Sequence, residues 1–361
     1  MESVVNPHFK LIIENTEIGV AELPQWATEQ NTDSQPDWIK ALASFLVNWF
    51  SESNHIPVQT SGSTGKPKTI LLEKQKMVAS AQKTNAFFDL KAGKTVLLPL
   101  SVDYIAGKMM LLRSLVGGMT LEVIAPTSTP FANTDKRYNF SPFVPMQVQT
   151  SLDKIDRQLD TVLIGGAPVD YKLEKELQKF QNCQAFQSFG MTETISHIAV
   201  KAINGTEKSE VYTCLQGVTV GQTEMGQLTI SAPHLVDETL ITNDLVKLID
   251  STHFEWLGRT DFVINSGGVK IHPEKVERKL QPFISERFII SSIPHEKLGN
   301  QVVLIIETSD WNTTQEESLK ENLQVVLERF EIPKAIFTLP QFVYTETQKI
   351  KRGETTALVE Y

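Results

Sequence analysis

The sequence predicts an α/β fold with two domains. Over the first two hundred residues, apolar runs typical of strands alternate with stretches of helical spacing, which favours mainly parallel sheets flanked by helices. From residue 211 to 256 the pattern changes to short strands broken by glycine and proline, which indicates a β-rich edge of the large domain. The last hundred residues have the pattern of a smaller α+β domain. At 361 residues the chain is long enough for both.

The elements follow in order along the chain. Asp37 to Phe50 has apolar residues at helical spacing, with Asp37 near a suitable N-cap, and Gly117 and Gly118 end a second helical stretch. We predict helices over 37–50, 107–116 and 170–180, and strands over 69–72, 96–100, 120–124, 161–164 and 185–186. In the small domain we predict helices over 276–280 and 316–330, and strands over 288–290 and 302–306.

Composition is that of an ordinary globular protein. Hydrophobic residues make up 41% and charged residues 21% of the chain, and the net charge of −9 argues against a nucleic-acid binder. Cys183 and Cys214 are too few for a disulfide framework and lack metal-ligand spacing, so we expect them to be small buried apolar residues. Residues 1–10 lack the pattern of a signal peptide, and no run of 18 apolar residues occurs. We therefore expect a cytoplasmic protein without membrane insertion.

One loop is rich in groups that bind phosphate. It consists of Thr60, Ser61, Gly62, Ser63, Thr64, Gly65, Lys66, Pro67 and Lys68. Glycines let backbone N–H groups approach an anion, hydroxyls donate further hydrogen bonds, and lysine supplies a point charge. The loop is not a Walker P-loop, because two residues rather than four separate its glycines. We predict that it holds a polyphosphate; the alternative is a flexible surface loop.

Further motifs follow at intervals. They are Ser188-Phe189-Gly190-Met191-Thr192-Glu193, Thr242-Asn243-Asp244, Gly258-Arg259-Thr260-Asp261 and the stretch 263–277. In order and spacing, these motifs and the phosphate loop resemble the adenylate-forming superfamily, which comprises acyl- and aryl-CoA synthetases, adenylation domains and luciferases. The resemblance runs from about Thr60 to the C-terminus. It implies ATP and Mg²⁺ as cofactors, a carboxylic acid as substrate and coenzyme A as co-substrate.

The resemblance also implies roles for single residues. Glu193 would hold Mg²⁺, and Thr192 would reach a phosphate oxygen or the ion. Phe189 would lie against adenine, and Asp244, with Arg259 beside it, would accept from the ribose hydroxyls. Other positions assigned to ATP or AMP are Gly165, Gly166, Ala167, Ser188, Gly190 and Met191. Taken singly, Phe189 could equally be core, Glu193 a surface carboxylate and Asp244 a turn residue.

A lysine near the C-terminus resembles the superfamily's catalytic lysine, which contacts the acyl carboxylate and the α-phosphate. By register it is Lys349, although Gln348 stands where the family has glycine, and Lys351 is the competing candidate. Asn243 and Phe262 are further departures, from a glycine and an aspartate respectively.

The resemblance places a hinge at Asp261. It divides the chain into an N-terminal domain, 1–260, that binds ATP and the acid, and a mobile C-terminal domain, 261–361, that carries the catalytic lysine. Gly267 and Gly268 would let the pantetheine of coenzyme A pass close to the backbone.

The chain is most similar to the compact o-succinylbenzoate–CoA ligases of menaquinone biosynthesis. Their acid has two carboxylates, so its pocket should hold a cation besides the catalytic lysine. Candidates for the acid site are Tyr104, Lys108, Arg113 and His197. The alternative for Lys108 and Arg113 is a pair of ordinary surface cations, and His197 could be a core histidine.

Other activities stay open. The acid could be another aryl or short-chain acid, or the chain could be a stand-alone adenylation protein that loads a carrier protein. The oligomeric state is also open, with a homodimer among the alternatives.

Overall fold

The computed structural model describes residues 4–59, 69–131, 135–345 and 350–360. Its larger sheet is built from β1 (Lys10–Ile13), β2 (Thr16–Gly19), β5 (Thr95–Leu98), β6 (Thr120–Val123), β7 (Tyr138–Phe143), β8 (Leu159–Ile164), β9 (Gln184–Gly190), β10 (His197–Ala202), β11 (Val211–Cys214), β12 (Thr219–Gln222), β13 (Gln227–Ser231), β14 (Leu240–Asp250) and β15 (His253–Arg259). Within the described ranges these thirteen strands lie in the order β12-β13-β14-β15-β11-β10-β9-β8-β7-β5-β6-β1-β2.

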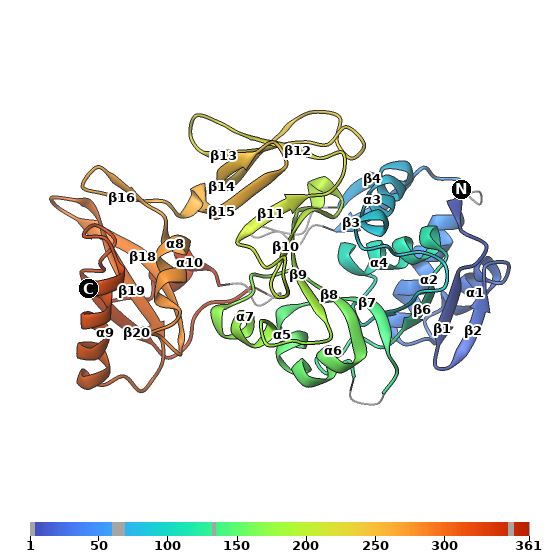
Figure 1. The fold of residues 1–361 in the computed structure, drawn as a ribbon, viewed down its shortest axis with the longest axis horizontal. Helices are drawn as coiled ribbons and strands as arrows, with labels where there is room; N and C mark the ends of the chain where they lie inside the picture. The colour runs from blue at the N-terminus through green and yellow to red at the C-terminus, as the bar shows by residue number, and fades with distance from the viewer. Residues whose placement is uncertain (1–3, 60–68, 132–134, 346–349, 361) are drawn as a thin grey trace.

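The sheet has a parallel part and an antiparallel part. Strands β1, β6, β5, β7, β8 and β9 are parallel to their neighbours in that run. From β9 through β10 and β11 to β15, β14, β13 and β12, every pairing is antiparallel. In Figure 1 the last four of these strands rise above the rest of the sheet as the yellow segment. The mixed α/β class and the β-rich edge predicted from sequence are therefore confirmed.

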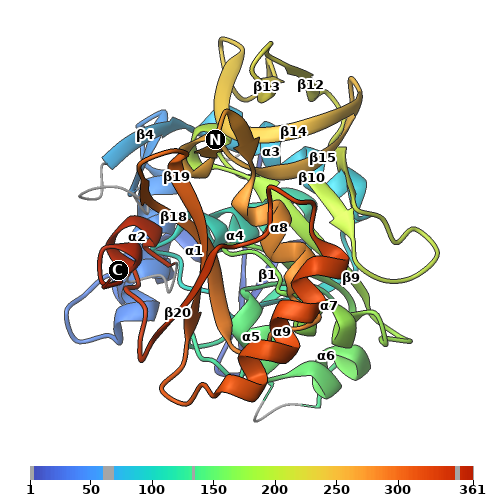
Figure 2. The same ribbon diagram turned by 90° about the vertical axis from the view of Figure 1, so that its left-hand side faces the viewer.

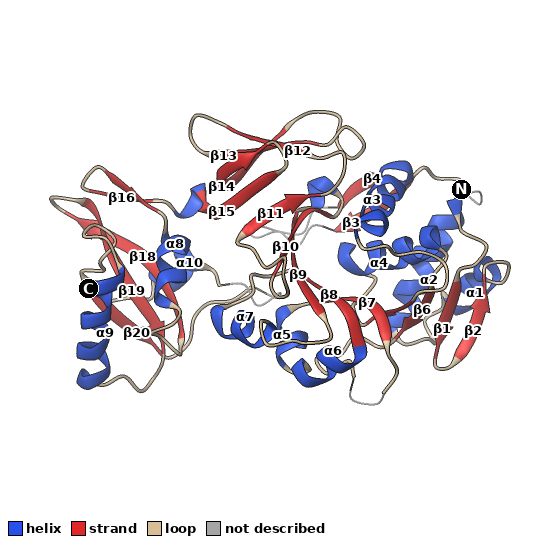
Figure 3. Ribbon diagram, viewed as in Figure 1, coloured by secondary structure: helices blue, strands red, loops and turns tan. Residues whose placement is uncertain are grey.

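Helices cover both faces of the parallel part. The first set is α1 (Leu23–Gln30), α2 (Asp37–Phe50), α3 (Lys74–Phe87) and α4 (Ile105–Gly117), and the second is α5 (Pro145–Gln149), α6 (Leu152–Gln158) and α7 (Tyr171–Leu177). Strand β5 shows the alternation, because Val96 and Leu98 belong to the apolar cluster under the first set and Leu97 to the cluster under the second. Figure 3 shows the two sets as separate groups of helices.

The hairpin β3 (His55–Gln59) and β4 (Thr69–Glu73) leads directly into α3. Helix α3 has no counterpart among the sequence predictions, because its inward face carries polar side chains. Ser80, Thr84 and Asn85 are all buried, as is Lys74, whose ammonium donates to the carbonyls of Trp49 (2.8 Å) and Ser51 (3.0 Å).

The C-terminal part has its own sheet and cores. Its elements are β16 (Ile264–Ser266), β17 (Val269–Ile271), α8 (Pro273–Leu280), β18 (Arg287–His295), β19 (Gly299–Glu307), α9 (Thr313–Val326), β20 (Ala335–Leu339) and α10 (Arg352–Thr356). Alternate residues of β19 enter two apolar clusters, one under α8 and α9 and one against Phe342 and Val359. Figure 2 shows α9 lying along one side of this sheet.

The described residues of the two sheets share no strand, and no apolar cluster of buried described residues spans them. This supports, as a proposal, the division into domains 1–260 and 261–361. No helix of the described chain is long and apolar enough to cross a membrane. Cys183 and Cys214 are both buried and unpaired, as expected.

Candidate active site

Two predicted groups lie outside the described residues. The first is the phosphate loop, with Thr60, Ser61, Gly62, Ser63, Thr64, Gly65, Lys66 and Lys68, and the second is Lys349. Next to the loop, Gln59 and Thr69 are paired across β3 and β4. Next to Lys349, Tyr344 and Ile350 form an antiparallel bridge. The roles of both groups stay predictions.

Two segments of the predicted nucleotide site meet where β8 and β9 end. These strands are parallel neighbours, so their carboxyl ends share one edge of the sheet, where α/β proteins commonly bind ligands. The Ser188 hydroxyl donates to the carbonyl of Ile164 (3.1 Å). A Cβ on Gly165 would lie 2.5 Å from that hydroxyl oxygen, which would have to move, and Gly166 has a φ of +82°, a conformation that favours glycine. Ala167 follows at the same edge.

Phe189 stands at the rim of an aromatic group. Its ring centroid lies 5.6 Å from that of Tyr212 and 5.1 Å from that of Phe254, the latter edge to face. These contacts hold the Phe189 ring on one side, and the side chain is only partly buried. Its stacking on adenine stays a proposal.

The next residues form a strained turn. A Cβ on Gly190 would lie 2.4 Å from the Cα of His197, because β9 and β10 approach closely there. Residues Thr192–Thr194 form a 3-10 turn in which the Thr194 hydroxyl bonds the backbone of Met191 and Ser196.

Ile195, which follows the 3-10 turn, has φ +67° and ψ −49°, with the Ser196 N–H donating to the Thr194 carbonyl (2.7 Å). This is a γ-turn with positive φ, a conformation that costs about 1–3 kcal/mol for a β-branched residue. Backbone strain of this kind gathers at functional sites, and it stands two residues after Glu193.

Glu193 is exposed on this turn. The described residues hold no group of three or more histidine, cysteine or acidic side chains able to cage a metal. Mg²⁺ is usually held by one or two carboxylates together with phosphate oxygens and water. A single carboxylate on the turn therefore fits Mg²⁺ delivered with ATP.

Asp244 is buried on β14, with 8% of its surface exposed. Its Oδ1 accepts from the indole N–H of Trp256 (2.9 Å). Burial raises the pKa of this carboxyl, while the Trp256 hydrogen bond and the charge of Arg259 act to lower it.

Arg259 is directed at the predicted hinge. Its Nε and a terminal nitrogen donate to Oδ2 of Asp261 (3.2 and 2.6 Å), and the Asn243 amide donates to Oδ1 (3.2 Å). Asn243, which departs from the family pattern, thus helps to hold Asp261. Phe262, the other departure, lies under the guanidinium of Arg352, 5.0 Å from its ring centroid.

Arg113 and His197 lie together in the interior. The Arg113 guanidinium donates to the Ser196 hydroxyl (3.1 Å) and faces Nδ1 of His197 (3.4 Å), whose Nε2 faces the Thr84 hydroxyl (3.3 Å). Only 3% of Arg113 is exposed, and burial lowers its pKa to about 9. Burial and the adjacent guanidinium hold the pKa of His197 well below its usual range.

No carboxylate of the described residues pairs with Arg113, and its Nε has no hydrogen-bond partner among them. A buried cation is rarely left without a counter-charge. Because Arg113 is buried, the alternative that it is an ordinary surface cation is wrong.

The other two acid-site candidates lie at the start of α4. The Lys108 ammonium donates to the carbonyls of Val102 (2.6 Å) and Asp103 (2.7 Å), so it fixes the preceding loop. Tyr104 is the residue before α4 and is 59% exposed. The side chains of Lys108 and Arg113 have no hydrogen-bond partner in common.

Gly267 and Gly268 form the turn between β16 and β17. Their φ values of +58° and +85° require glycine in a two-residue hairpin turn whatever passes nearby. A role in the passage of coenzyme A stays a proposal.

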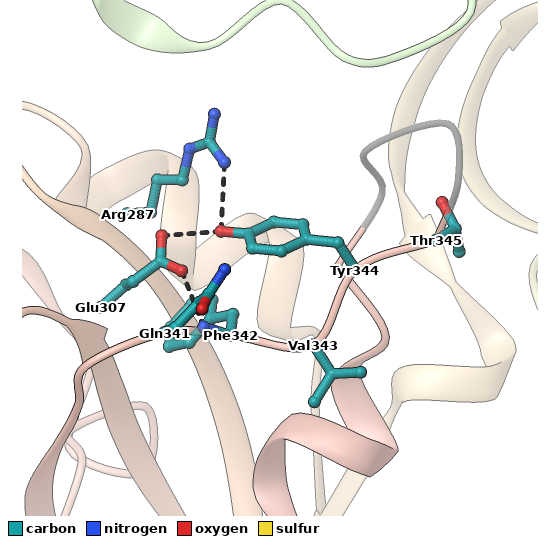
Figure 4. Close-up of a pocket in the computed structure, with 7 residues that line it drawn as sticks. All are labelled: Arg287, Glu307, Gln341, Phe342, Val343, Tyr344 and Thr345. Carbon is teal, nitrogen blue, oxygen red and sulfur yellow. Dashed lines mark hydrogen bonds between the residues drawn. The ribbon is translucent and has the colours of Figure 1, made fainter.

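A separate pocket of about 730 Å³ lies in the C-terminal part (Figure 4). The Tyr344 hydroxyl donates to Glu307 (2.6 Å) and accepts from Arg287 (3.1 Å). The lining comprises Arg287, Glu307, Gln341, Phe342, Val343, Tyr344 and Thr345, none of which is a predicted site residue.

Sequence reasoning missed three residues of the site: Thr84, Ser196 and Trp256. Thr84 could have been found from the sequence, because its hydroxyl stands among apolar residues that recur at helical spacing. No sequence pattern marks Ser196 or Trp256, because their hydrogen-bond partners lie on other strands and helices.

Comparisons with known proteins agree with this geometry. The profile of the family "AMP-binding enzyme" matches residues 22–230. A 2-succinylbenzoate–CoA ligase of Salmonella typhimurium is 26% identical over 333 residues, covering 87% of this chain and 70% of the relative. One of Bacillus cytotoxicus is 23% identical over 340 residues, covering 84% and 70%.

Two solved structures are similar. An acyl-CoA synthetase (AMP-forming)/AMP-acid ligase II-like protein of Dyadobacter fermentans is 35% identical, with a TM-score of 0.62, covering 93% of this chain and 98% of that one. The o-succinylbenzoate coenzyme A synthetase of Bacillus subtilis, in complex with ATP and magnesium ion, is 19% identical with a TM-score of 0.69, covering 96% and 83%.

Proposed function

Because the chain belongs to the AMP-binding enzyme family and is an AMP-forming acid–CoA ligase, we propose that it activates o-succinylbenzoate. The curated relatives from Salmonella typhimurium and Bacillus cytotoxicus carry that activity in their names. At 23% and 26% identity these names alone do not decide the acid, so the proposal depends on the site.

The proposal of a diacid substrate depends mainly on the buried guanidinium of Arg113. An unpaired charge in the interior costs several kcal/mol, and a ligand carboxylate would remove most of that cost. Arg113 reaches Ser196, three residues after Glu193, so this cation lies beside the turn proposed to bind the metal. A diacid could hold one carboxylate at Arg113 and present the other for reaction.

The reaction has two steps. A carboxylate oxygen of the acid attacks the α-phosphorus of ATP and pyrophosphate leaves, which gives acyl-AMP. The sulfur of coenzyme A then attacks the acyl carbon, and AMP leaves with the electron pair of the broken bond.

Since both partners of the first step are anions, catalysis consists mainly of positioning and charge neutralisation. Residues 60–68 would hold the β- and γ-phosphates, Phe189 the adenine and Asp244 the ribose. Lys349 would contact the reacting carboxylate and the α-phosphate. Magnesium, when bound at Glu193, would supply further neutralisation of the phosphates.

The test is AMP release against a panel of carboxylic acids, with and without coenzyme A. We expect o-succinylbenzoate to be turned over best, and its methyl ester at the distal carboxylate to be poor. Equal turnover of ester and diacid would rule out this acid. Release that requires a carrier protein instead of coenzyme A would favour the adenylation protein.

A further inference from the structure

The buried position of Asp244 raises the question of how its carboxylate is held. A carboxylate in the interior is stable only with hydrogen-bond donors around it. Arg259 lies opposite Asp244 in the pairing of β14 with β15, yet its guanidinium is bound to Asp261. Among the described residues, the side-chain donor to Asp244 is the indole of Trp256.

A bulge in β15 puts Trp256 in reach. Asp244 pairs with Arg259 and Leu245 with Gly258, but Val246 pairs with Trp256 rather than with Leu257. The register shift therefore brings Trp256 to the face of the sheet that Asp244 shares with Val246, where diagonal neighbours touch. Without the bulge, Leu257 would stand there and Asp244 would have no indole donor.

Trp256 is itself held in place. Its backbone carbonyl accepts from Arg278 of α8 (3.0 Å), so its backbone is tied to the first helix of the C-terminal part. Figure 1 shows α8 beside the end of β15. The indole itself is partly buried and packs against the main apolar cluster, which restricts its motion.

We propose that Trp256 is a positioning residue of the nucleotide site, whose indole N–H fixes one oxygen of Asp244 and leaves the other free to accept from the ribose of ATP. The inference deepens the proposed function and rests on the role assigned there to Asp244. The charged and titratable groups around the carboxyl are Arg259, Asp261 and Tyr212. Loss of the indole N–H removes a contact that lowers the pKa of Asp244, so the carboxyl of such a variant protonates at higher pH.

The experiment compares Trp256→Phe with Trp311→Phe, measuring the Kd of ATP by calorimetry without any acid. Trp311 is the matched control, because its indole nitrogen has no partner among the described residues. We expect Trp256→Phe to weaken ATP binding about tenfold at pH 8, the effect of one hydrogen bond to a charged group.

Asp244→Asn completes a double-mutant cycle. In that background we expect Trp256→Phe to change the Kd less than about twofold, because its partner has already lost its charge. ATP binding by Trp256→Phe equal to that of Trp311→Phe would overturn the inference. So would an equal loss in the Asp244→Asn background. Because no acid is present, these results stand whatever the panel of acids shows.

Discussion

Replacing Arg113 by methionine should make the free protein more stable and destroy its preference for a diacid. Methionine has a similar length and no charge, so it can fill the same space in the interior. Burial lowers the pKa of Arg113 from its ordinary value to about 9. At about 1.4 kcal/mol for each pKa unit, the free energy of burying the charge is on the order of 5 kcal/mol.

The substitution also removes the hydrogen bond to Ser196, which contributes about 1.5–3 kcal/mol when one partner is charged. We therefore expect the free energy of unfolding to rise by about 2 kcal/mol in the absence of substrate. Because the folded pKa of Arg113 lies below its unfolded pKa, the destabilisation from this charge decreases only as the pH rises above about 9. Below pH 9 Arg113 is charged in both the folded and the unfolded chain, so the cost of burying the charge does not change with pH. The rise in the free energy of unfolding of Arg113→Met should therefore be the same at pH 6.5 and 8.

Lys108→Met on the same helix is the matched control. Its ammonium has two carbonyl acceptors, at 2.6 and 2.7 Å, so its removal should lower the free energy of unfolding by about 1–3 kcal/mol. Urea unfolding measures both variants, and kcat/KM for o-succinylbenzoate and its distal methyl ester measures preference. An Arg113→Met protein that is less stable than the unmodified one and still prefers the diacid would refute the reasoning.

Three further predictions concern the rest of the site. Lys349→Ala should lose pyrophosphate release from acid and ATP but still form thioester from supplied acyl-AMP; equal damage to both half-reactions would contradict the assignment. Thr64→Ala should raise the barrier of adenylation by about 2.7–4 kcal/mol, as pyrophosphate release would measure, with an unchanged thermal midpoint. Gly190→Ala should lower the free energy of unfolding by about 3 kcal/mol, because its Cβ would lie 2.4 Å from the Cα of His197. Gly353→Ala, with no atom within 4 Å of the new Cβ, should change stability by less than about 1 kcal/mol.

Periodicity predicted the elements whose inner faces are mainly apolar. Helix α2 has the predicted bounds, Asp37–Phe50, because its buried residues recur every three to four positions. Helix α3 could not be predicted in the same way, since Ser80, Thr84 and Asn85 interrupt its inner face. These three polar residues, which interrupt the apolar pattern, hydrogen-bond to Arg113 or to the residues around it.

The same distinction applies to the site. Motif spacing pointed to Asp244 and Arg259, which the structure pairs across neighbouring strands. It could not predict that Arg259 turns to Asp261, because that depends on the path of the chain after β15. Nor could it predict the contact of Trp256 with Asp244, which a one-residue bulge creates.

The two cysteines have a consequence for an enzyme that handles a thiol. Burial raises the pKa of Cys214 to about 12 and that of Cys183 still higher, so neither forms thiolate near neutral pH. Thiolate is the attacking species in disulfide exchange, and both sulfurs are also out of reach of reagents. Oxidised coenzyme A should therefore form no mixed disulfide with the folded chain. A chromogenic aryl disulfide can then follow the disappearance of free coenzyme A during turnover without labelling the enzyme.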